Sequence, residues 1–315
     1  MAGKILFYHA IRGLWDTPPG LLWLIFAASN LGLVLAYAIV RELFQDRQAG
    51  LAALVLYLFL PSKLFFLPLL NSVTPTFVLL PLWLLVRYLT SRHPGWLAAL
   101  GVALYALVLF DPVPLITGLT FVALIGRAWA QKTIGWKNVV AILALVPLAF
   151  FAADCVVALR YGYEIVSAFA FAYHDAKHFN ATHGRSYDVW LVPNLIETLS
   201  NTGILTSALV LGIAVAALPR MAWGLWREKL RGAVTVACEP GVCLALSALA
   251  SLAVVDLMGV NRGETVRLWI FLGAFLQLPV AGFCGRRPGL LIVLMTGAIM
   301  QACIGLGSRG FILPG

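Results

Sequence analysis

The chain has 315 residues, of which 62% are hydrophobic and only 11% are charged. Soluble globular domains carry about 25% charged residues, so this composition excludes a soluble protein, and most of the chain must face lipid. The net charge of +9 does not indicate nucleic-acid binding, because the bases occupy short connections between apolar runs, as they do in multi-pass membrane proteins. We expect one integral membrane domain over residues 1–315, built only from α-helices, because a backbone in lipid must form its hydrogen bonds within each segment.

The chain opens with a short amphipathic, aromatic segment at residues 4–17, which we place at the membrane interface. Apolar runs close to the length of a membrane span follow it. They predict a polytopic bundle of about ten spans, with nine to eleven allowed because the second and fourth runs are short. The predicted spans are 19–41, 50–61, 74–90, 95–110, 113–128, 138–159, 202–219, 240–256, 266–285 and 289–307.

Charges alternate between the two sets of connections. Most of the 22 bases fall in one set, which is therefore predicted to be cytoplasmic, so the protein is expected in the plasma (inner) membrane. Most of the 13 acids, and every histidine except His93, fall in the other set. This second set includes a predicted non-cytoplasmic loop at 160–190. Groups capable of chemistry that gather at one rim of a lipid-embedded fold indicate a site at that rim.

The most polar stretch is Tyr173–Trp190 within this loop. His174 and His178 are four residues apart and would share a helix face, with Asp175 beside them, which suits a divalent metal site. Two other interpretations stay open. The histidines are simply solvated, or they bind a phosphate or sugar hydroxyls together with Lys177 or Arg185.

Two further groups lie at the predicted outer rim. Asn194, Glu197 and Asn201 form one helical stripe, which faces either the interior of the bundle or, on a helix lying flat, water. Glu264 and Arg267 are three residues apart and can pair on one helical turn, either as a structural clamp or as an anion-binding element.

Isolated carboxylates complete the set of candidate residues. Asp16 and Asp111 both stand beside prolines at the outer rim, and either is a candidate general base. A role as partner of an arginine or as a helix cap is the alternative for each of them.

Three stretches resemble the GT-C superfamily of polytopic glycosyltransferases. Asp16-Thr-Pro-Pro-Gly20, which leads directly into a span, is similar to the motif that ends the first external loop of the family. Residues 28–62 resemble the next two family helices with their short basic turn. The stretches 184–195 and 261–269 resemble late external features.

The resemblance implies a GT-C-like fold, a polyprenyl-phosphate-linked sugar donor bound on the non-cytoplasmic side, and often a divalent cation such as Mg or Mn. By this resemblance Asp16 is the base, and Arg267 with Arg185 or a metal neutralises the leaving phosphate. Glu197 and Glu264 join the substrate contacts. His174, Asp175 and His178 are the candidate metal ligands, with the two histidines as substrate contacts otherwise.

The first family helix and most of its external loop have no counterpart before Asp16. This departure leaves two hypotheses open. The first is a membrane glycosyltransferase that uses a polyprenyl-phosphate sugar. The second is a non-catalytic lipid-binding, transport or assembly subunit, on the same scaffold, that associates with a membrane-protein partner.

Overall fold

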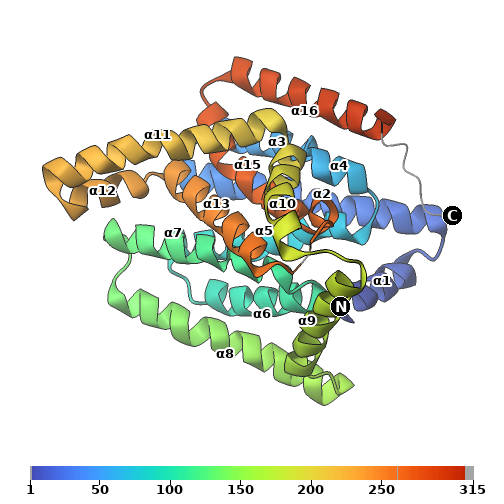
Figure 1. Ribbon diagram of the computed structural model, residues 1–315. Helices are drawn as coiled ribbons and strands as arrows, with labels where there is room; N and C mark the ends of the chain where they lie inside the picture. Colours follow the sequence, from blue (N-terminus) through green and yellow to red (C-terminus); the bar gives the residue numbers. More distant parts are fainter. Residues whose placement is uncertain (1, 261, 309–315) are drawn as a thin grey trace.

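A computed structural model describes residues 2–260 and 262–308 of the chain. These residues form helices joined by short connections and contain no strand, as Figure 1 shows. The prediction of an all-α fold is therefore confirmed, and the long apolar helices are consistent with a multi-pass membrane protein. The GT-C-like relationship stays a prediction.

The first half of the chain contains α1 (Ala2–Leu14), α2 (Pro18–Phe44), α3 (Arg47–Leu58), α4 (Pro61–Phe66), α5 (Thr74–Ser91), α6 (Gly95–Phe110), α7 (Gly118–Ala130) and α8 (Trp136–Tyr161). Two short 3-10 helices, η1 (Leu70–Val73) and η2 (Val113–Thr117), precede α5 and α7. The second half contains α9 (Ile165–Thr182), α10 (Tyr187–Thr202), α11 (Ile204–Glu228), α12 (Leu230–Ala237), α13 (Pro240–Met258), α14 (Thr265–Leu268), α15 (Ile270–Cys284) and α16 (Pro288–Ser308).

All ten predicted spans fall on apolar helices of this structure. Eight segments of the described chain are long and apolar enough to cross a membrane, and they include Arg47–Phe66, in which α4 continues α3. The remaining two, Gly95–Phe110 and Ile270–Cys284, are apolar but shorter. How many of the ten cross the bilayer stays a prediction.

Helix starts follow local capping chemistry. The hydroxyl of Thr17 accepts a hydrogen bond from the N–H of Gly20 at 3.2 Å, and prolines occupy the first turn of α2, where a helix needs no donor. The carboxylate of Asp46 likewise accepts a bond from the N–H of Gln48 at 2.8 Å at the start of α3. The Asp16-Thr-Pro-Pro-Gly20 motif thus starts a long apolar helix, as expected.

The short helix α15 lies at the centre of the bundle. Nearly every residue from Ile270 to Cys284 is buried, and α3, α13 and α10 pack around it. A helix that is apolar on all sides is stable only when other elements enclose it. Its one polar side chain, Gln277, donates to the carbonyl of Leu56 at 2.9 Å. Enclosure explains why 15 residues suffice here.

The helix α8 shows the opposite environment. It is 26 residues long, highly apolar and exposed along most of its length, and it packs mainly against α6 (Figure 1). In water such a surface would drive aggregation, whereas in a bilayer it contacts lipid. This exposure supports the inference, drawn from composition, that lipid surrounds the chain.

The segment 160–190 differs from the prediction. Residues 165–182 form α9 and Tyr187 begins α10, so only the turn between them and the residues before Ile165 are irregular. The segment is thus largely helical, and its place on the non-cytoplasmic side stays a prediction. Gly184, with a φ of 60°, provides the left-handed turn that separates the two helices.

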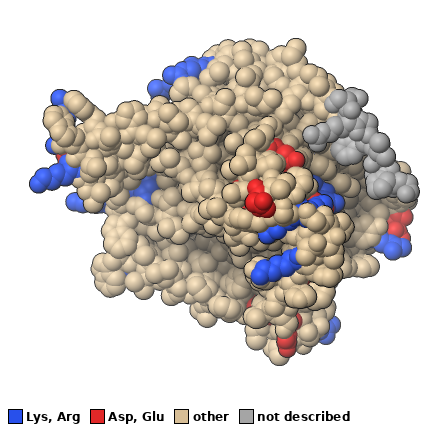
Figure 2. All heavy atoms as spheres, in the orientation of Figure 1, with Lys and Arg blue, Asp and Glu red and all other residues tan. Residues whose placement is uncertain are grey.

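Charge is distributed unevenly over the surface. Figure 2 shows Lys and Arg side chains gathered over the free ends of α11 and α12, and side chains of both signs around α9 and α10. Which side of the molecule is cytoplasmic stays a prediction.

Close contact between α6 and α8 generates a test of this packing. A Cβ atom on Gly101 would overlap the carbonyl of Val146 and lie 2.7 Å from the Cβ of Ala149, whereas a Cβ on Gly126 in α7 would meet nothing within 4 Å. Gly101→Ala is expected to destabilise the protein by about 1–3 kcal/mol through overpacking. Gly126→Ala is expected to be neutral or to stabilise by up to about 1 kcal/mol. Thermal unfolding of both variants in one detergent measures the difference, and equal melting temperatures would contradict the packing.

Candidate functional site

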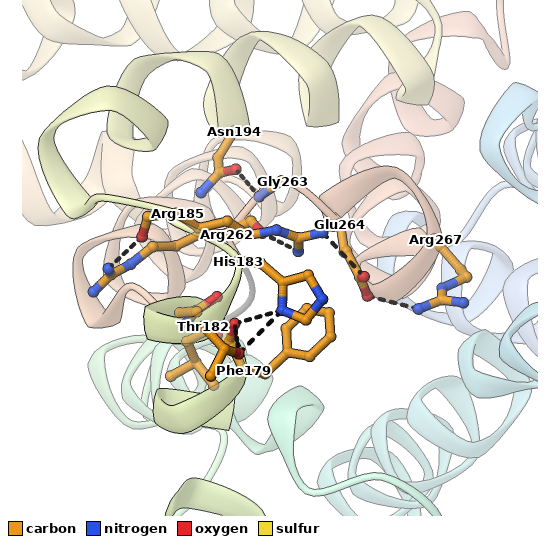
Figure 3. A network of polar contacts seen from close by, with 11 residues as sticks. Phe179, Thr182, His183, Arg185, Asn194, Arg262, Gly263, Glu264 and Arg267 are labelled. Carbon is orange, nitrogen blue, oxygen red and sulfur yellow. Dashed lines mark hydrogen bonds and ion pairs between the residues drawn. The ribbon is translucent and has the colours of Figure 1, made fainter. Parts of the chain in front are cut away.

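The turn between α9 and α10 and the segment that follows α13 are joined by two arginines (Figure 3). Nη1 of Arg185 donates to the carbonyl of Arg262 at 2.6 Å, and Nη1 of Arg262 donates to the carbonyl of Arg185 at 2.8 Å. These segments are 77 residues apart in sequence. The reciprocal bonds fix both guanidinium groups at one corner of the fold.

Glu264 extends this corner toward α14. Its carboxylate accepts bonds from Nη2 of Arg185 at 3.4 Å and from Nη2 of Arg267 at 2.6 Å. The predicted pairing of Glu264 with Arg267 is confirmed, and Arg267 remains exposed (Figure 3). Arg185 and Arg267 share this carboxylate, whereas Arg262 donates to the carbonyls of Gly259 and Arg185. The three arginines and Glu264 are here called the arginine corner, and the group carries excess positive charge.

The polar stripe on α10 supports the arginine corner from within. Asn194 is 2% exposed; its Nδ2 donates to Asp256 at 3.2 Å, and its Oδ1 accepts the N–H of Gly263 at 3.2 Å. Glu197 accepts a bond from the hydroxyl of Thr265 at 3.0 Å. The prediction that the stripe faces the interior is confirmed, and the alternative of a helix lying flat with this face in water is wrong.

An apolar groove of about 320 Å³ adjoins the arginine corner. Its walls come from η2, α9 and the end of α13, with Val113, Phe169, Tyr173, Met258 and Val260 among the lining residues. The side chain of Asn180 in α9 donates to the carbonyl of Val260 at 2.8 Å and so ties α9 to the segment after α13. Val260 is two residues from Arg262, so the groove and the arginine corner are close together in the chain.

The three proposed metal ligands do not converge. His174, Asp175 and His178 are exposed on α9, and the two histidines lie one turn apart, as the sequence spacing indicates. Among the described residues, no group of three or more His, Cys, Asp or Glu side chains could hold a metal ion. Because this donor set does not fit a divalent cation, we derive no step through a metal. A cation at this site stays a prediction.

Within the described part of the chain, neither of the two candidate bases has a hydrogen bond or ion pair with a residue of the arginine corner. Asp16 is exposed and accepts a bond from Arg12 at 2.8 Å; the bond and charge of Asp16 raise the pKa of Arg12. Asp111 is buried and pairs with Lys4 at 3.0 Å, while Lys4 also donates to Asn71 at 3.1 Å. Pairing with a cation, which the sequence allows as the alternative, is thus what the structure shows for both acids.

Sequence reasoning missed two cations that the structure places in polar contacts. Arg262 belongs to the arginine corner, and its role depends on a contact distant in sequence. Lys63 is fully buried in α4, where its Nζ donates to Asn30 at 2.7 Å and lies 4.5 Å from the centre of the Tyr57 ring. A lysine within an apolar run was a signal available from sequence, because a charge inside a membrane fold is costly unless it has a use.

No protein-family model matches the chain, and neither a curated protein nor a solved structure is significantly similar to it. The properties of the site therefore rest on its own geometry.

The buried Asn194 bridge can be tested by stability. Asn194→Leu leaves the Asp256 carboxylate and the N–H of Gly263 without their partners, and each loss costs about 1–3 kcal/mol. The variant is therefore expected to unfold at a clearly lower temperature. Adding Asp256→Leu removes the buried acid and is expected to restore part of the loss, as in a double-mutant cycle. Unchanged stability of Asn194→Leu, or strictly additive losses in the double variant, would contradict the bridge.

Proposed function

We propose that this protein binds, in the plasma (inner) membrane, a lipid that carries a phosphate group. The phosphate contacts the arginine corner, and the hydrocarbon chain lies in the adjoining apolar groove. The observation that carries the proposal is the closeness of the two in the chain, since Met258 and Val260 line the groove and Arg262 lies two residues after Val260. The corner faces away from the cytoplasm in this proposal.

Charge supports the phosphate end of the proposal. Arg185 and Arg262 are held by each other's carbonyls, and the single carboxylate of Glu264 is shared by Arg185 and Arg267. A planar guanidinium presents five N–H donors that match the oxygens of a phosphate. Donors already held in place lose little side-chain entropy when the anion arrives, which favours binding.

The groove supports the lipid end of the proposal. Its lining is almost wholly apolar, and it lies beside a helix, α9, whose outward aromatic residues Phe171 and Tyr173 are exposed. A chain that enters from the bilayer exchanges one apolar environment for another. Specificity would then come from the phosphate, and affinity from packing along the groove.

The resemblance to GT-C glycosyltransferases extends this proposal to a polyprenyl-phosphate-linked sugar and to its transfer. In that reaction the acceptor oxygen bonds to the anomeric carbon, the bond from that carbon to the phosphate oxygen breaks, and the electron pair leaves with the phosphate. The proton of the acceptor hydroxyl passes to a carboxylate. Asp16 is the more accessible candidate, because Asp111 is buried against Lys4. A non-catalytic subunit requires only the binding step.

The first test is binding of undecaprenyl phosphate by the full chain. Arg267→Gln is expected to weaken binding about tenfold, because a charge-assisted bond contributes about 1.5–3 kcal/mol. Arg12→Gln is the matched control: Arg12 is also exposed and paired with a carboxylate on its own helical segment. Native mass spectrometry or a change in melting temperature with added lipid gives the affinity. Equal losses in both variants would contradict a site at the arginine corner.

The groove is tested with variants on one helix. Ala172 lines the groove, so Ala172→Phe is expected to block the chain of undecaprenyl phosphate, whereas Ala181→Phe, at an exposed position of α9 outside the lining, is expected to leave binding unchanged. If inorganic phosphate bound as tightly as undecaprenyl phosphate, the hydrocarbon chain of the lipid would contribute nothing to the affinity.

Catalysis is tested separately with a polyprenyl-phosphate sugar and a soluble acceptor. Removal of a general base lowers turnover by about 10²–10⁴-fold, so Asp16→Asn is expected to lose turnover and to keep lipid binding. Asp111→Asn is expected to affect stability through Lys4 rather than the chemical step. Unchanged turnover in Asp16→Asn would remove the base role, and binding without any turnover in the unaltered protein would identify the non-catalytic subunit.

A further inference from the structure

The opposite, basic side of the molecule contains a second polar cavity of about 270 Å³. It lies between the ends of α2, α5 and α7, and its polar lining comprises Glu42, Gln45, Thr90, Arg92, Arg127, Gln131 and Thr133. Glu42, its one acid, is already paired with Arg87 at 3.3 Å. The charge inside the cavity therefore depends on the contacts of Arg92 and Arg127.

Arg92 is held in an unusual position. It caps α5 with a φ of 61°, a left-handed conformation that a glycine or asparagine adopts more easily. Its Nη2 donates to the carbonyl of Thr133 at 2.6 Å, whereas its buried Nη1 has no hydrogen-bond partner among the described residues. Burial lowers the pKa of Arg92. A left-handed backbone and a buried Nη1 atom without a hydrogen-bond partner, both at one half-buried residue, indicate that its side chain serves a ligand.

Arg127 connects the polar cavity to a second hollow. Its Nε donates to the carbonyl of Cys238 at 2.7 Å, which anchors the side chain between α7 and the end of α12. Arg127 also lines an apolar groove of about 460 Å³ between α7, α12 and α13, where Val122, Leu246 and Ala250 are among its neighbours. Figure 1 shows α7 lying beside α13 at this end of the bundle. One arginine therefore stands where a polar cavity meets an apolar channel.

We propose that this second site binds an anionic glycerophospholipid, with its phosphate between Arg92 and Arg127 and one acyl chain in the groove along α7 and α13. The charge of the cavity selects the occupant: two arginines bonded only to carbonyls attract a phosphate. Basic pockets between membrane helices bind anionic headgroups in this way. The site shares no residue with the arginine corner, so it does not rest on the function proposed above.

The test compares, in the full chain, two basic residues whose backbone is in the left-handed conformation. Arg92→Gly removes the charge, and glycine suits the left-handed backbone, so the variant is expected to fold. Lys132→Gly is the matched control, because Lys132 has a φ of 56°, carries the same charge and does not line the cavity. Dioleoyl-phosphatidylglycerol is expected to raise the melting temperature of the unaltered protein and of Lys132→Gly. Its affinity for Arg92→Gly and Arg127→Gln is expected to fall about tenfold or more.

Further arms distinguish the source of the phosphate. Dioleoyl-phosphatidylcholine, with the same chains and no net charge, is expected to bind at least tenfold more weakly, and soluble glycerol phosphate is expected to give no shift. Ala250→Phe fills the groove and is expected to reduce phosphatidylglycerol binding, whereas Ala253→Phe, exposed on α13 outside the lining, is expected to preserve it. Equal binding of both lipids, equal losses in Arg92→Gly and Lys132→Gly, or full binding of glycerol phosphate would overturn the proposal.

Discussion

Two guanidinium groups that bond each other's main-chain carbonyls hold the candidate site together. Arg185 belongs to the turn between α9 and α10, and Arg262 belongs to the segment between α13 and α14. Without this exchange, the carbonyls of two helix-ending segments would need other donors, which are scarce beside lipid. Arg185, held in this exchange, also donates to the carboxylate of Glu264. The two hydrogen bonds that join these segments therefore also fix the positions of both guanidinium groups.

Each of the two proposed sites combines an apolar groove with arginine side chains, although the helices that supply them differ. On one side a groove along α9 meets arginines from two turns, and on the other a groove along α13 meets arginines from α5 and α7. In both places a guanidinium group is held by carbonyls and has no carboxylate partner among the described residues, as at Arg262 and Arg127. A carboxylate partner would have satisfied the arginine equally well, but it would have cancelled the charge that a phosphate needs. An arginine bonded to a carbonyl is therefore better suited to bind an anionic ligand than an arginine paired with a carboxylate.

Much of the fold could be predicted from the sequence because lipid imposes strict rules on it. Ten apolar runs became ten apolar helices, and short spacings gave correct local geometry, as with Glu264 and Arg267 or the inward stripe of Asn194. Contacts between distant segments could not be predicted, because no local pattern encodes them. The pairing of Asp111 with Lys4, the role of Arg262 and both grooves depend on how helices pack. The helix at 165–182 was not predicted either, because the interpretation of that segment rested on its histidines rather than on its apolar residues.

Lys63 has a consequence for how the chain enters the membrane. A lysine at the centre of an inserting helix costs about 2.5–3.5 kcal/mol, and α4 carries this residue at the end of an otherwise apolar segment. Its hydrogen-bond acceptor, Asn30, belongs to α2, which is synthesised earlier and is already available when α4 leaves the ribosome. The ring of Tyr57, in the preceding α3, arrives just before the lysine does. The order of residues along the chain thus supplies each partner of the ammonium group before the group itself must leave water.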